Sequence, residues 1–288
     1  RNGNTIVSVD NKELKDSIAK TNTIANQPRT TLNSVSQQTP MITFVDDDGS
    51  GKVLDKLKPL AIEKQVPFCL AVVSDFMLGK ESDAGLGGSF LDVAQVKDLY
   101  ENYGFEIQSH SATHPAIGDL TTDEEQWYEI RNSYETLNRY GLNVEYLVYP
   151  YGSNNKSVRE KVSQYYKGAI GTSTDLNEPP INTFALNRIP LGSFTNGNNT
   201  LEYYKSKVDE AIANNEWLVF MLHVGNPDHD EIQQQHLSDL IDYIKTTSAK
   251  IVTVKEGYET FGNLIDNNDR EFYFAKNGKN NMVNYNPV

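Results

Sequence analysis

The sequence predicts an α/β protein whose parallel strands and helices close into a barrel. From Met41 onward, short apolar runs alternate with segments of helical periodicity. Repeated strand–helix units build a parallel sheet with right-handed crossovers. Six or more such units in a chain of 288 residues favour an irregular (β/α) barrel over an open sheet.

The expected elements follow one another in regular alternation. Strands are expected to begin near Met41, Val66, Phe105, Val144, Lys167, Phe184, Trp217 and Lys250. Helices are expected over 52–65, 92–103, 122–140, 155–166, 200–214 and 231–247. Thr122 and Glu125 have the spacing of a capping box, and Asp92 is placed to cap the helix after it. The last helix carries an apolar stripe, typical of a helix on a sheet, formed by Leu237, Leu240, Ile241 and Ile244.

Composition divides the chain into three parts. Residues 1–38 are rich in Asn, Thr, Ser and Gln and contain no aromatic residue. They are interpreted as a polar helical arm or linker that orders on a partner surface. Residues 39–265 form the expected barrel. Residues 266–288 contain a strand-like segment ending in an Asn-Gly turn, which predicts a short C-terminal β extension or the start of a further module.

Charge and cysteine content exclude several classes of partner and site. The chain has 26 Lys and Arg against 39 Asp and Glu, a net charge of -13. Without a basic stripe, nucleic acid and anionic membranes are poor partners. No apolar run reaches the roughly 18 residues of a membrane span. The single cysteine, Cys69, excludes an intrachain disulfide and a cysteine-based zinc site, and its apolar surroundings predict burial.

Three adjacent carboxylates stand where the first strand ends. The apolar run from Met41 leads directly into Asp46, Asp47 and Asp48, followed by Gly49. Ligand sites in parallel α/β folds form at the carboxyl ends of strands. Neighbouring carboxylates repel one another unless a cation or base neutralises them. A solvated acidic turn has the same sequence, but the position at a strand end favours a metal or catalytic site.

Two of the five histidines follow the third expected strand. His110 and His114 are four residues apart, and Pro115 limits the length of the turn between them. This spacing lets both imidazoles face one point. Imidazole is the commonest protein ligand of zinc-like ions, and a carboxylate can complete the set. Taken alone, the pair is equally consistent with a structural origin.

Two further strand ends carry polar groups. Pro150 fixes a turn after the strand near Val144 and leaves the N–H of Tyr151 to face a ligand. His223 ends the strand that begins at Trp217, and its pKa near neutrality makes it a candidate acid or base. The structural alternatives are a simple strand-ending turn and a structural histidine.

Together these four pieces resemble the polysaccharide deacetylase (NodB-homology) family, the family 4 carbohydrate esterases. That family has T-F-D-D-G, H-S/T-x-x-H-P, R-x-P-Y-G and a late L-x-H element, in this order. The matching pieces, within about residues 41–263, are Asp47-Asp48-Gly49, His110-Ser111 with His114-Pro115, Pro150-Tyr151-Gly152 and Leu222-His223. The resemblance implies a distorted (β/α) barrel of the polysaccharide deacetylase type.

The resemblance also implies a metal site. Asp48, His110 and His114 would bind one divalent ion, for which zinc is the first choice and cobalt, nickel and manganese are alternatives. The ion would polarise the acetyl carbonyl and acidify its bound water.

The remaining roles concern proton transfer and substrate contact. Asp47 would be the general base, and His223 would protonate the leaving amine. The Tyr151 N–H would hold the oxyanion together with the metal. Contacts to the substrate would come from Tyr149, Pro150 and Leu222.

The sequence departs from the family pattern in two places that bear on these roles. Asp46 stands where the family commonly has Phe, which leaves a register slipped by one residue as an alternative to the one anchored on Gly49. Val148 replaces the arginine that precedes the Pro-Tyr pair. Arg188, in a later segment, is the candidate that pairs with and orients the base instead.

The implied function is metal-dependent removal of N-acetyl groups from a GlcNAc-containing polysaccharide such as peptidoglycan, poly-GlcNAc or a chitin-like polymer. An O-acetyl sugar esterase would use the same machinery. A different class of protein, a non-catalytic glycan-binding or structural module of a cell-surface or phage-tail assembly, would explain the two end segments as attachments to a larger assembly. An extracellular or cell-surface location is expected from the substrate class and not from a targeting signal, because the sequence begins at Arg1 and shows no signal peptide.

Overall fold

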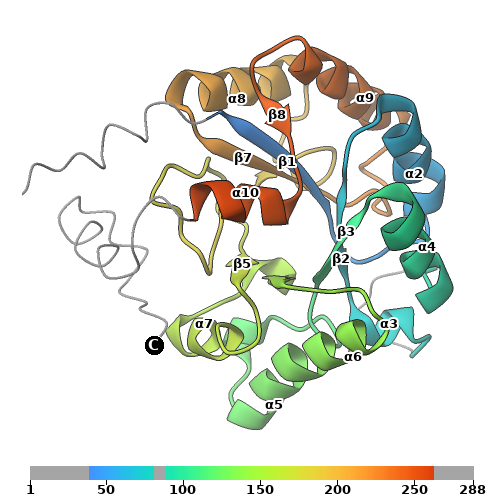
Figure 1. The fold of residues 1–288 in the computed structure, drawn as a ribbon, viewed down its shortest axis with the longest axis vertical. Helices are drawn as coiled ribbons and strands as arrows, with labels where there is room; N and C mark the ends of the chain where they lie inside the picture. Colours follow the sequence, from blue (N-terminus) through green and yellow to red (C-terminus); the bar gives the residue numbers. More distant parts are fainter. Residues whose placement is uncertain (1–38, 81–88, 263–288) are drawn as a thin grey trace, which may run out of the picture. The chain divides into compact units, whose positions relative to one another are not determined.

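A computed structural model describes residues 39–80 and 89–262. The expected arm at 1–38 and the expected extension at 266–288 lie outside the described residues. Within them, helices surround a curled parallel sheet (Figure 1). No helix of this described part is long and apolar enough to cross a membrane.

The described strands form one sheet in which every named pair is parallel. Their bounds are β1 Met41–Asp46, β2 Cys69–Val72, β3 Glu106–Ser109, β4 Tyr146–Val148, β5 Gly168–Ile170, β6 Ile189–Pro190, β7 Trp217–Leu222 and β8 Lys250–Ile251. The order is β5-β4-β3-β2-β1-β7-β6, and β8 pairs with the first residues of β1. Leu186, shortly before β6, bridges to Ile170 of β5. The two sheet edges therefore meet, which confirms the expected distorted α/β barrel.

The helices agree closely with the expected ranges. They are α2 Val53–Lys64, α3 Ser74–Met77, α4 Val93–Tyr103, α5 Asp123–Trp127, α6 Ser133–Arg139, α7 Lys156–Val162, α8 Leu201–Asn214, α9 Glu231–Lys245 and α10 Val254–Phe261. Thr122 forms the predicted capping box, and Asp92 caps its helix as predicted, also in a capping box. The apolar stripe of α9 is fully buried.

Side-chain alternation in the strands separates two apolar layers. In β1, Ile42 and Phe44 belong to the larger cluster, which the surrounding helices share. Met41 and Val45 belong to a second cluster, on the opposite face of the sheet. Cys69 lies in this second cluster, buried as expected. Alternation follows from the pleat, which turns successive side chains to opposite faces.

Helix α10 fills the amino end of the barrel. Its Tyr258 stacks on Tyr146 at 4.6 Å and meets Trp217 edge-on at 5.3 Å. These partners are the first residues of β4 and β7, so α10 covers the end of the sheet where the strands begin. The opposite, carboxyl end is left for a ligand. The sequence did not predict α10, because an eight-residue helix containing Gly257 has a weak pattern.

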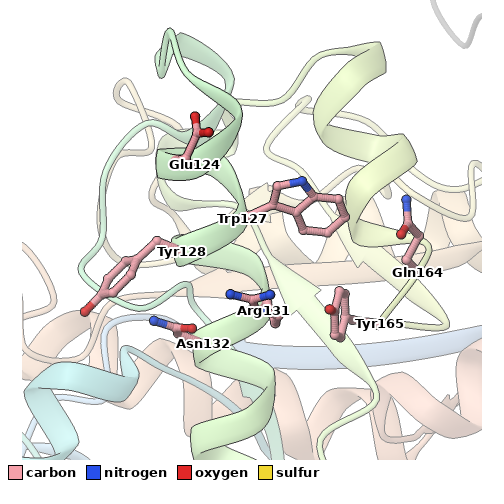
Figure 2. Close-up of a pocket in the computed structure, with 7 residues that line it drawn as sticks. All are labelled: Glu124, Trp127, Tyr128, Arg131, Asn132, Gln164 and Tyr165. Atoms are coloured by element: carbon pink, nitrogen blue, oxygen red, sulfur yellow. The ribbon is translucent and has the colours of Figure 1, made fainter.

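Two expected elements differ in detail. The strand expected near Phe184 is β6, which pairs only at Ile189–Pro190. The helix expected over 122–140 is interrupted by a π-helical turn, η3 (Tyr128–Asn132). A surface hollow of about 430 Å³ lies beside this turn (Figure 2). It is lined by Glu124, Trp127, Tyr128, Arg131, Asn132, Gln164 and Tyr165.

Candidate active site

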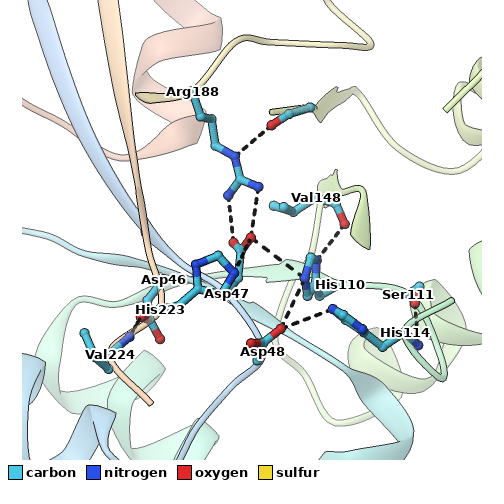
Figure 3. A network of polar contacts seen from close by, with 11 residues as sticks. Asp46, Asp47, Asp48, His110, Ser111, His114, Val148, Arg188, His223 and Val224 are labelled. Carbon is cyan, nitrogen blue, oxygen red and sulfur yellow. Dashed lines mark hydrogen bonds and ion pairs between the residues drawn. The ribbon is translucent and has the colours of Figure 1, made fainter. Parts of the chain in front are cut away.

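The polar residues predicted from separate strand ends meet at the carboxyl end of the sheet (Figure 3). Asp47 and Asp48 follow β1, and His110 follows β3. His223 follows β7, and Arg188 lies directly before β6. The register of the parallel strands brings these ends together, since Asp46 pairs with Leu222 of β7 and with Leu70 of β2.

Asp48, His110 and His114 form a compact cluster of potential metal ligands. Asp48 Oδ1 lies 3.2 Å from Nε2 of His114 and 3.5 Å from Nε2 of His110. One ligand atom from each of the three residues lies within 4.8 Å of the others. Nδ1 of His110 is 2.8 Å from the carbonyl oxygen of Val148. A carbonyl only accepts, so the His110 proton sits on Nδ1 and Nε2 keeps its lone pair for a ligand.

The chemistry of this cluster fits a divalent cation. Two imidazoles and one carboxylate are a donor set used by zinc and related ions. Asp48 Oδ1 is buried and has no hydrogen-bond partner among the described residues, an arrangement that is costly unless a cation compensates it. Burial opposes ionisation of Asp48, but the two adjacent imidazoles, His110 and His114, hold its pKa well below the usual value. A negative ligand therefore faces the two imidazoles.

Asp47 is paired with Arg188 in the way the sequence predicted. Nη1 and Nη2 of Arg188 donate to the two carboxylate oxygens of Asp47 at 2.7 and 2.9 Å. Nε of Arg188 donates to the Gly171 carbonyl at 2.8 Å, and the arginine is fully buried. Burial alone would raise the pKa of Asp47, but the charges of Arg188 and the nearby histidines outweigh it and lower the pKa. Asp47 is thus held ionised in one orientation.

The Asp46 carboxylate is hydrogen-bonded to the backbone that follows β7. Its Oδ1 accepts a hydrogen bond from the Val224 N–H at 2.8 Å, and the side chain has no exposed surface. Burial raises the pKa of Asp46 well above its usual value. Asp48 has a φ of +76° and Gly49 a φ of +71°, so the chain reverses in a left-handed turn directly after Asp47. This geometry supports the register anchored on Gly49 rather than the slipped one.

His223 faces Asp47 from the β7 side. Its Nε2 lies 3.7 Å from Asp47 Oδ2, and 15% of its side chain is exposed. Burial lowers the pKa of His223, which makes its protonated form a stronger acid.

Two exposed aromatic rings flank the cluster. Tyr151 is 62% exposed, and its ring meets that of His114 edge-on at 4.8 Å. Phe194 is 54% exposed and meets the His223 ring in the same way, at 4.8 Å. The sequence did not single out Phe194, because one aromatic residue in a loop carries no pattern. Tyr151 has a φ of +57° within the turn η4 (Pro150–Gly152), so the turn at this position is a left-handed one.

The substrate contacts predicted for Tyr149 and Leu222 stay predictions, and the side chains of these residues are not exposed for them. Both side chains have no exposed surface and belong to the larger apolar cluster. A side chain without exposed surface offers nothing for a glycan to touch. Pro150 is also buried and shapes the turn that presents Tyr151. The side chain of Leu222 is buried in the core, while its neighbour His223 faces Asp47.

The comparison with known families agrees with this geometry. A family model described as polysaccharide deacetylase matches residues 33–167, which include Asp47, Asp48, His110 and His114. This match supports a place for the chain in the polysaccharide deacetylase family. The match likewise supports a hydrolase of the carbohydrate esterase class. No curated protein matches the chain.

Solved structures with the same fold include enzymes and an inactive relative. One is a peptidoglycan N-acetylglucosamine deacetylase, 14% identical with a TM-score of 0.55, covering 81% of this chain and 98% of its own. A family 4 carbohydrate esterase from Streptomyces lividans in complex with acetate is 13% identical with a TM-score of 0.52, covering 74% and 91%. A family 4 pseudoenzyme from Bacillus anthracis is 12% identical with a TM-score of 0.54, covering 76% and 65%. These likenesses establish the fold, so activity must be argued from the site.

Proposed function

We propose that this polysaccharide deacetylase removes N-acetyl groups from a GlcNAc-containing glycan in a metal-dependent reaction. Peptidoglycan, poly-GlcNAc and chitin-like polymers are the candidate substrates. The observation that carries the proposal is the position of Asp47 between two groups. Its Oδ2 lies 3.8 Å from Nε2 of His110, in the metal-ligand cluster, and 3.7 Å from Nε2 of His223.

Asp48, His110 and His114 are the residues that would hold the metal. When bound, a divalent ion, for which zinc is the first choice, polarises an acyl oxygen and acidifies water in its coordination sphere. The hydrogen bond from His110 to Val148 fixes one imidazole in the orientation this binding requires.

Asp47 is proposed as the general base. The Arg188 guanidinium keeps it ionised and directs both of its oxygens. In that state Asp47 can accept a proton from a water molecule as the water attacks the acetyl carbonyl. General bases contribute roughly a hundredfold or more to such reactions.

His223 and Tyr151 are proposed to act on the other two developing charges. The protonated His223 would donate to the leaving nitrogen, and its lowered pKa favours the donation. The backbone N–H of Tyr151 would donate to the oxyanion of the tetrahedral intermediate. Such a donor typically contributes about 3 kcal/mol to the transition state.

Several features support a glycan amide as substrate. The exposed rings of Tyr151 and Phe194 flank the polar cluster and offer apolar faces for sugar rings. An acid aimed at the leaving group matters most for an amine, which is a poor leaving group without a proton. Cell-wall and exopolysaccharide substrates lie outside the cell membrane, so an extracellular or cell-surface location is part of the proposal.

The deciding experiment is acetate release from a panel of acetylated glycans. Chito-oligosaccharides, peptidoglycan and acetylated xylan would each be incubated with the chelator-treated protein, with and without added zinc or cobalt. We expect metal-dependent release from the GlcNAc substrates and a loss of about a hundredfold or more in Asp47→Asn. Release from acetylated xylan alone would instead identify an O-acetyl esterase.

A second candidate is a non-catalytic glycan-binding module. The pseudoenzyme from Bacillus anthracis shows that this fold occurs without activity. Against this reading, the metal-ligand cluster, Asp47 and His223 are all in place here. Metal binding and glycan binding without acetate release from any member of the panel would favour the second candidate.

A further inference from the structure

We propose that Glu129 is a positioning residue that holds the histidine loop, residues 110–114, in the shape needed for metal binding. Glu129 lies on the π turn η3, on the helical layer outside the sheet, and is only 5% exposed. It is not one of the ligands and does not belong to the motifs that the sequence suggested. The inference rests on the proposed function only in that the Asp48, His110 and His114 cluster binds a divalent cation.

The Glu129 carboxylate accepts three hydrogen bonds from the middle of the histidine loop. Oε2 accepts from the N–H groups of Ala112 and Thr113, at 2.9 and 2.8 Å. Oε1 accepts from the Thr113 hydroxyl at 2.7 Å. Hydrogen bonds to an ionised acceptor are stronger than neutral ones, and more so when buried. A single side chain therefore anchors the two residues that lie directly before His114.

The histidine loop has a backbone shape that needs support. Ser111 and His114 have φ values of +65° and +69°, in the left-handed region that side chains other than glycine rarely adopt. Such conformations persist only where surrounding contacts impose them, and they cluster at functional sites. Without them, His110 and His114 would not turn their rings toward the same carboxylate oxygen.

Several other polar backbone groups of the loop are paired elsewhere. The carbonyls of Ser111 and Ala112 accept from the N–H groups of Ser74 and Asp75 at the start of α3, at 3.2 and 3.0 Å. The His114 N–H donates to the Ser111 hydroxyl at 2.9 Å. Glu129 supplies the acceptor for the N–H groups of Ala112 and Thr113. Removing its carboxylate would leave a buried donor, Ala112, and a partly buried one, Thr113, without partners.

The π turn explains how Glu129 reaches the loop. A continuous α-helix was expected over 122–140, and the turn widens it at 128–132. Tyr128, Arg131 and Asn132 line the outer hollow in Figure 2, whereas Glu129 and Ile130 are buried. The Ser133 hydroxyl lies 2.7 and 3.0 Å from the Glu129 and Ile130 carbonyl oxygens, which stabilises the irregular backbone. Single π turns of this kind frequently mark functional positions.

Metal affinity is the property that tests this inference. Full-length wild type, Glu129→Ala and Glu129→Gln would be freed of metal, and the zinc dissociation constant measured by competition with a chromophoric chelator. We expect Glu129→Ala to weaken zinc binding about tenfold or more, as for other residues that orient metal ligands. The zinc affinity of Glu129→Gln should lie between those of wild type and Glu129→Ala, because the glutamine amide oxygen still accepts the N–H bonds but carries no charge. The visible spectrum of the cobalt-loaded variants should change with the ligand geometry.

Ile130→Val is the matched control. Ile130 is buried in the same π turn and has no hydrogen bond to the loop from its side chain. Its truncation perturbs packing there without touching the Glu129 carboxylate, so zinc affinity should stay within about twofold of wild type, the scatter of such comparisons. If Glu129→Ala does not fold, Glu129→Gln and Thr113→Val, which removes one of the three hydrogen bonds, carry the test. Circular dichroism verifies folding in each case.

The outcomes separate this inference from the proposed function. Zinc binding by Glu129→Ala that equals wild type would overturn the positioning role, whatever the activity. Equal weakening by Glu129→Ala and Ile130→Val would also overturn it, since the effect would then be one of stability. If wild type binds zinc but releases no acetate, the proposed function fails, and the affinity comparison still decides the role of Glu129. If the wild type binds neither zinc nor cobalt, both the proposed function and the positioning role of Glu129 are refuted.

Discussion

Arg188 and Asp47 are 141 positions apart in the chain, yet they form a two-pronged ion pair with N···O distances of 2.7 and 2.9 Å. Both side chains are almost fully buried. The planar guanidinium matches the two carboxylate oxygens, a geometry that lysine cannot reproduce. The ion pair therefore holds the ionised carboxylate of Asp47 beside His110 and His223. It also prevents that carboxylate from rotating toward one of the two histidines.

Arg188→Lys should impair catalysis more than metal binding. Lysine keeps the positive charge but loses the fork, so Asp47 is no longer oriented by two parallel bonds. We expect kcat for acetate release to fall about a hundredfold, the scale of a lost general base. Zinc affinity should change little. A double variant, Arg188→Lys with Asp47→Asn, should be no slower than Asp47→Asn alone, because the arginine acts through Asp47. Additive losses would contradict this.

His223→Gln should show a strong dependence on the leaving group. If His223 protonates the departing nitrogen, amide substrates need it and good leaving groups do not. Acetate release from chito-oligosaccharides should fall about a hundredfold or more. Hydrolysis of 4-nitrophenyl acetate, whose phenolate leaves without a proton, should fall much less. Equal losses on both substrates would assign His223 another role.

His229 should make the fold sensitive to mild acid. It is fully buried in the loop after β7, its Nε2 lies 3.0 Å from Gln234 Oε1, and burial lowers its pKa to about 4. In the unfolded chain His229 takes up a proton near pH 6.5, whereas in the folded chain it stays neutral until about pH 4. The contribution of His229 to the free energy of unfolding is therefore fully present above pH 6.5 and is lost as the pH falls towards 4. His229 alone should lower the free energy of unfolding by about 2 kcal/mol between pH 7.5 and pH 5.

Chemical denaturation at the two pH values tests the His229 prediction. His229→Gln cannot take up a proton in this range, so its unfolding free energy should vary less with pH than that of wild type. The difference between the two proteins isolates His229 from every other titrating group. An identical pH dependence in both would refute the prediction.

Zinc should stabilise the folded protein through the cluster of Asp48, His110 and His114. A ligand that binds only the folded state adds about 2.7 kcal/mol at a concentration one hundred times its dissociation constant. The melting temperature of chelator-treated protein should therefore rise on addition of zinc. His110→Ala combined with His114→Ala should abolish the rise, whereas Asp47→Asn should keep it. A rise that survives the double alanine variant would place the metal elsewhere.

Gly257→Ala should disrupt the amino end of the barrel. A Cβ on Gly257 would overlap the indole ring of Trp217, which is fully buried and donates from Nε1 to the Thr43 hydroxyl at 2.9 Å. Overpacking of this kind costs about 1–3 kcal/mol. Urea denaturation should show that loss, whereas Glu259→Ala, at an exposed position of the same helix, should cost much less. If Gly257→Ala leaves the free energy of unfolding unchanged, α10 can move away from Trp217 without cost and the prediction is wrong.

Much of the architecture could be read from local patterns. The apolar stripe of α9 and the caps at Asp92 and Thr122 depend on residues within a few positions of one another. The same is true of the rule that polar residues directly after a buried strand lie at the ligand end. Such short-range signals can be recognised in the sequence alone. For this reason His110 and His223 lie at the strand ends where the sequence predicted them.

Only the tertiary structure decided which of several adjacent residues faces the site. Asp46, Asp47 and Asp48 are alike in sequence, but a left-handed φ at Asp48 and the pairing of Asp46 with Val224 send them in different directions. Tyr149 turns into the core while Tyr151 is exposed. Neighbouring side chains differ in this way because pleat and turn angles, not composition, set their direction.

The sequence by itself determined the alternation of strands with most of the helices, the end of the sheet where polar groups gather, and the residue types able to bind a cation. The tertiary structure decided the contacts between distant segments: Glu129 on the histidine loop, Phe194 beside His223, and α10 across the amino end. The reason is physical. Periodicity and capping are interactions between near neighbours, whereas these contacts depend on how the sheet curls and on where a helix widens into a π turn.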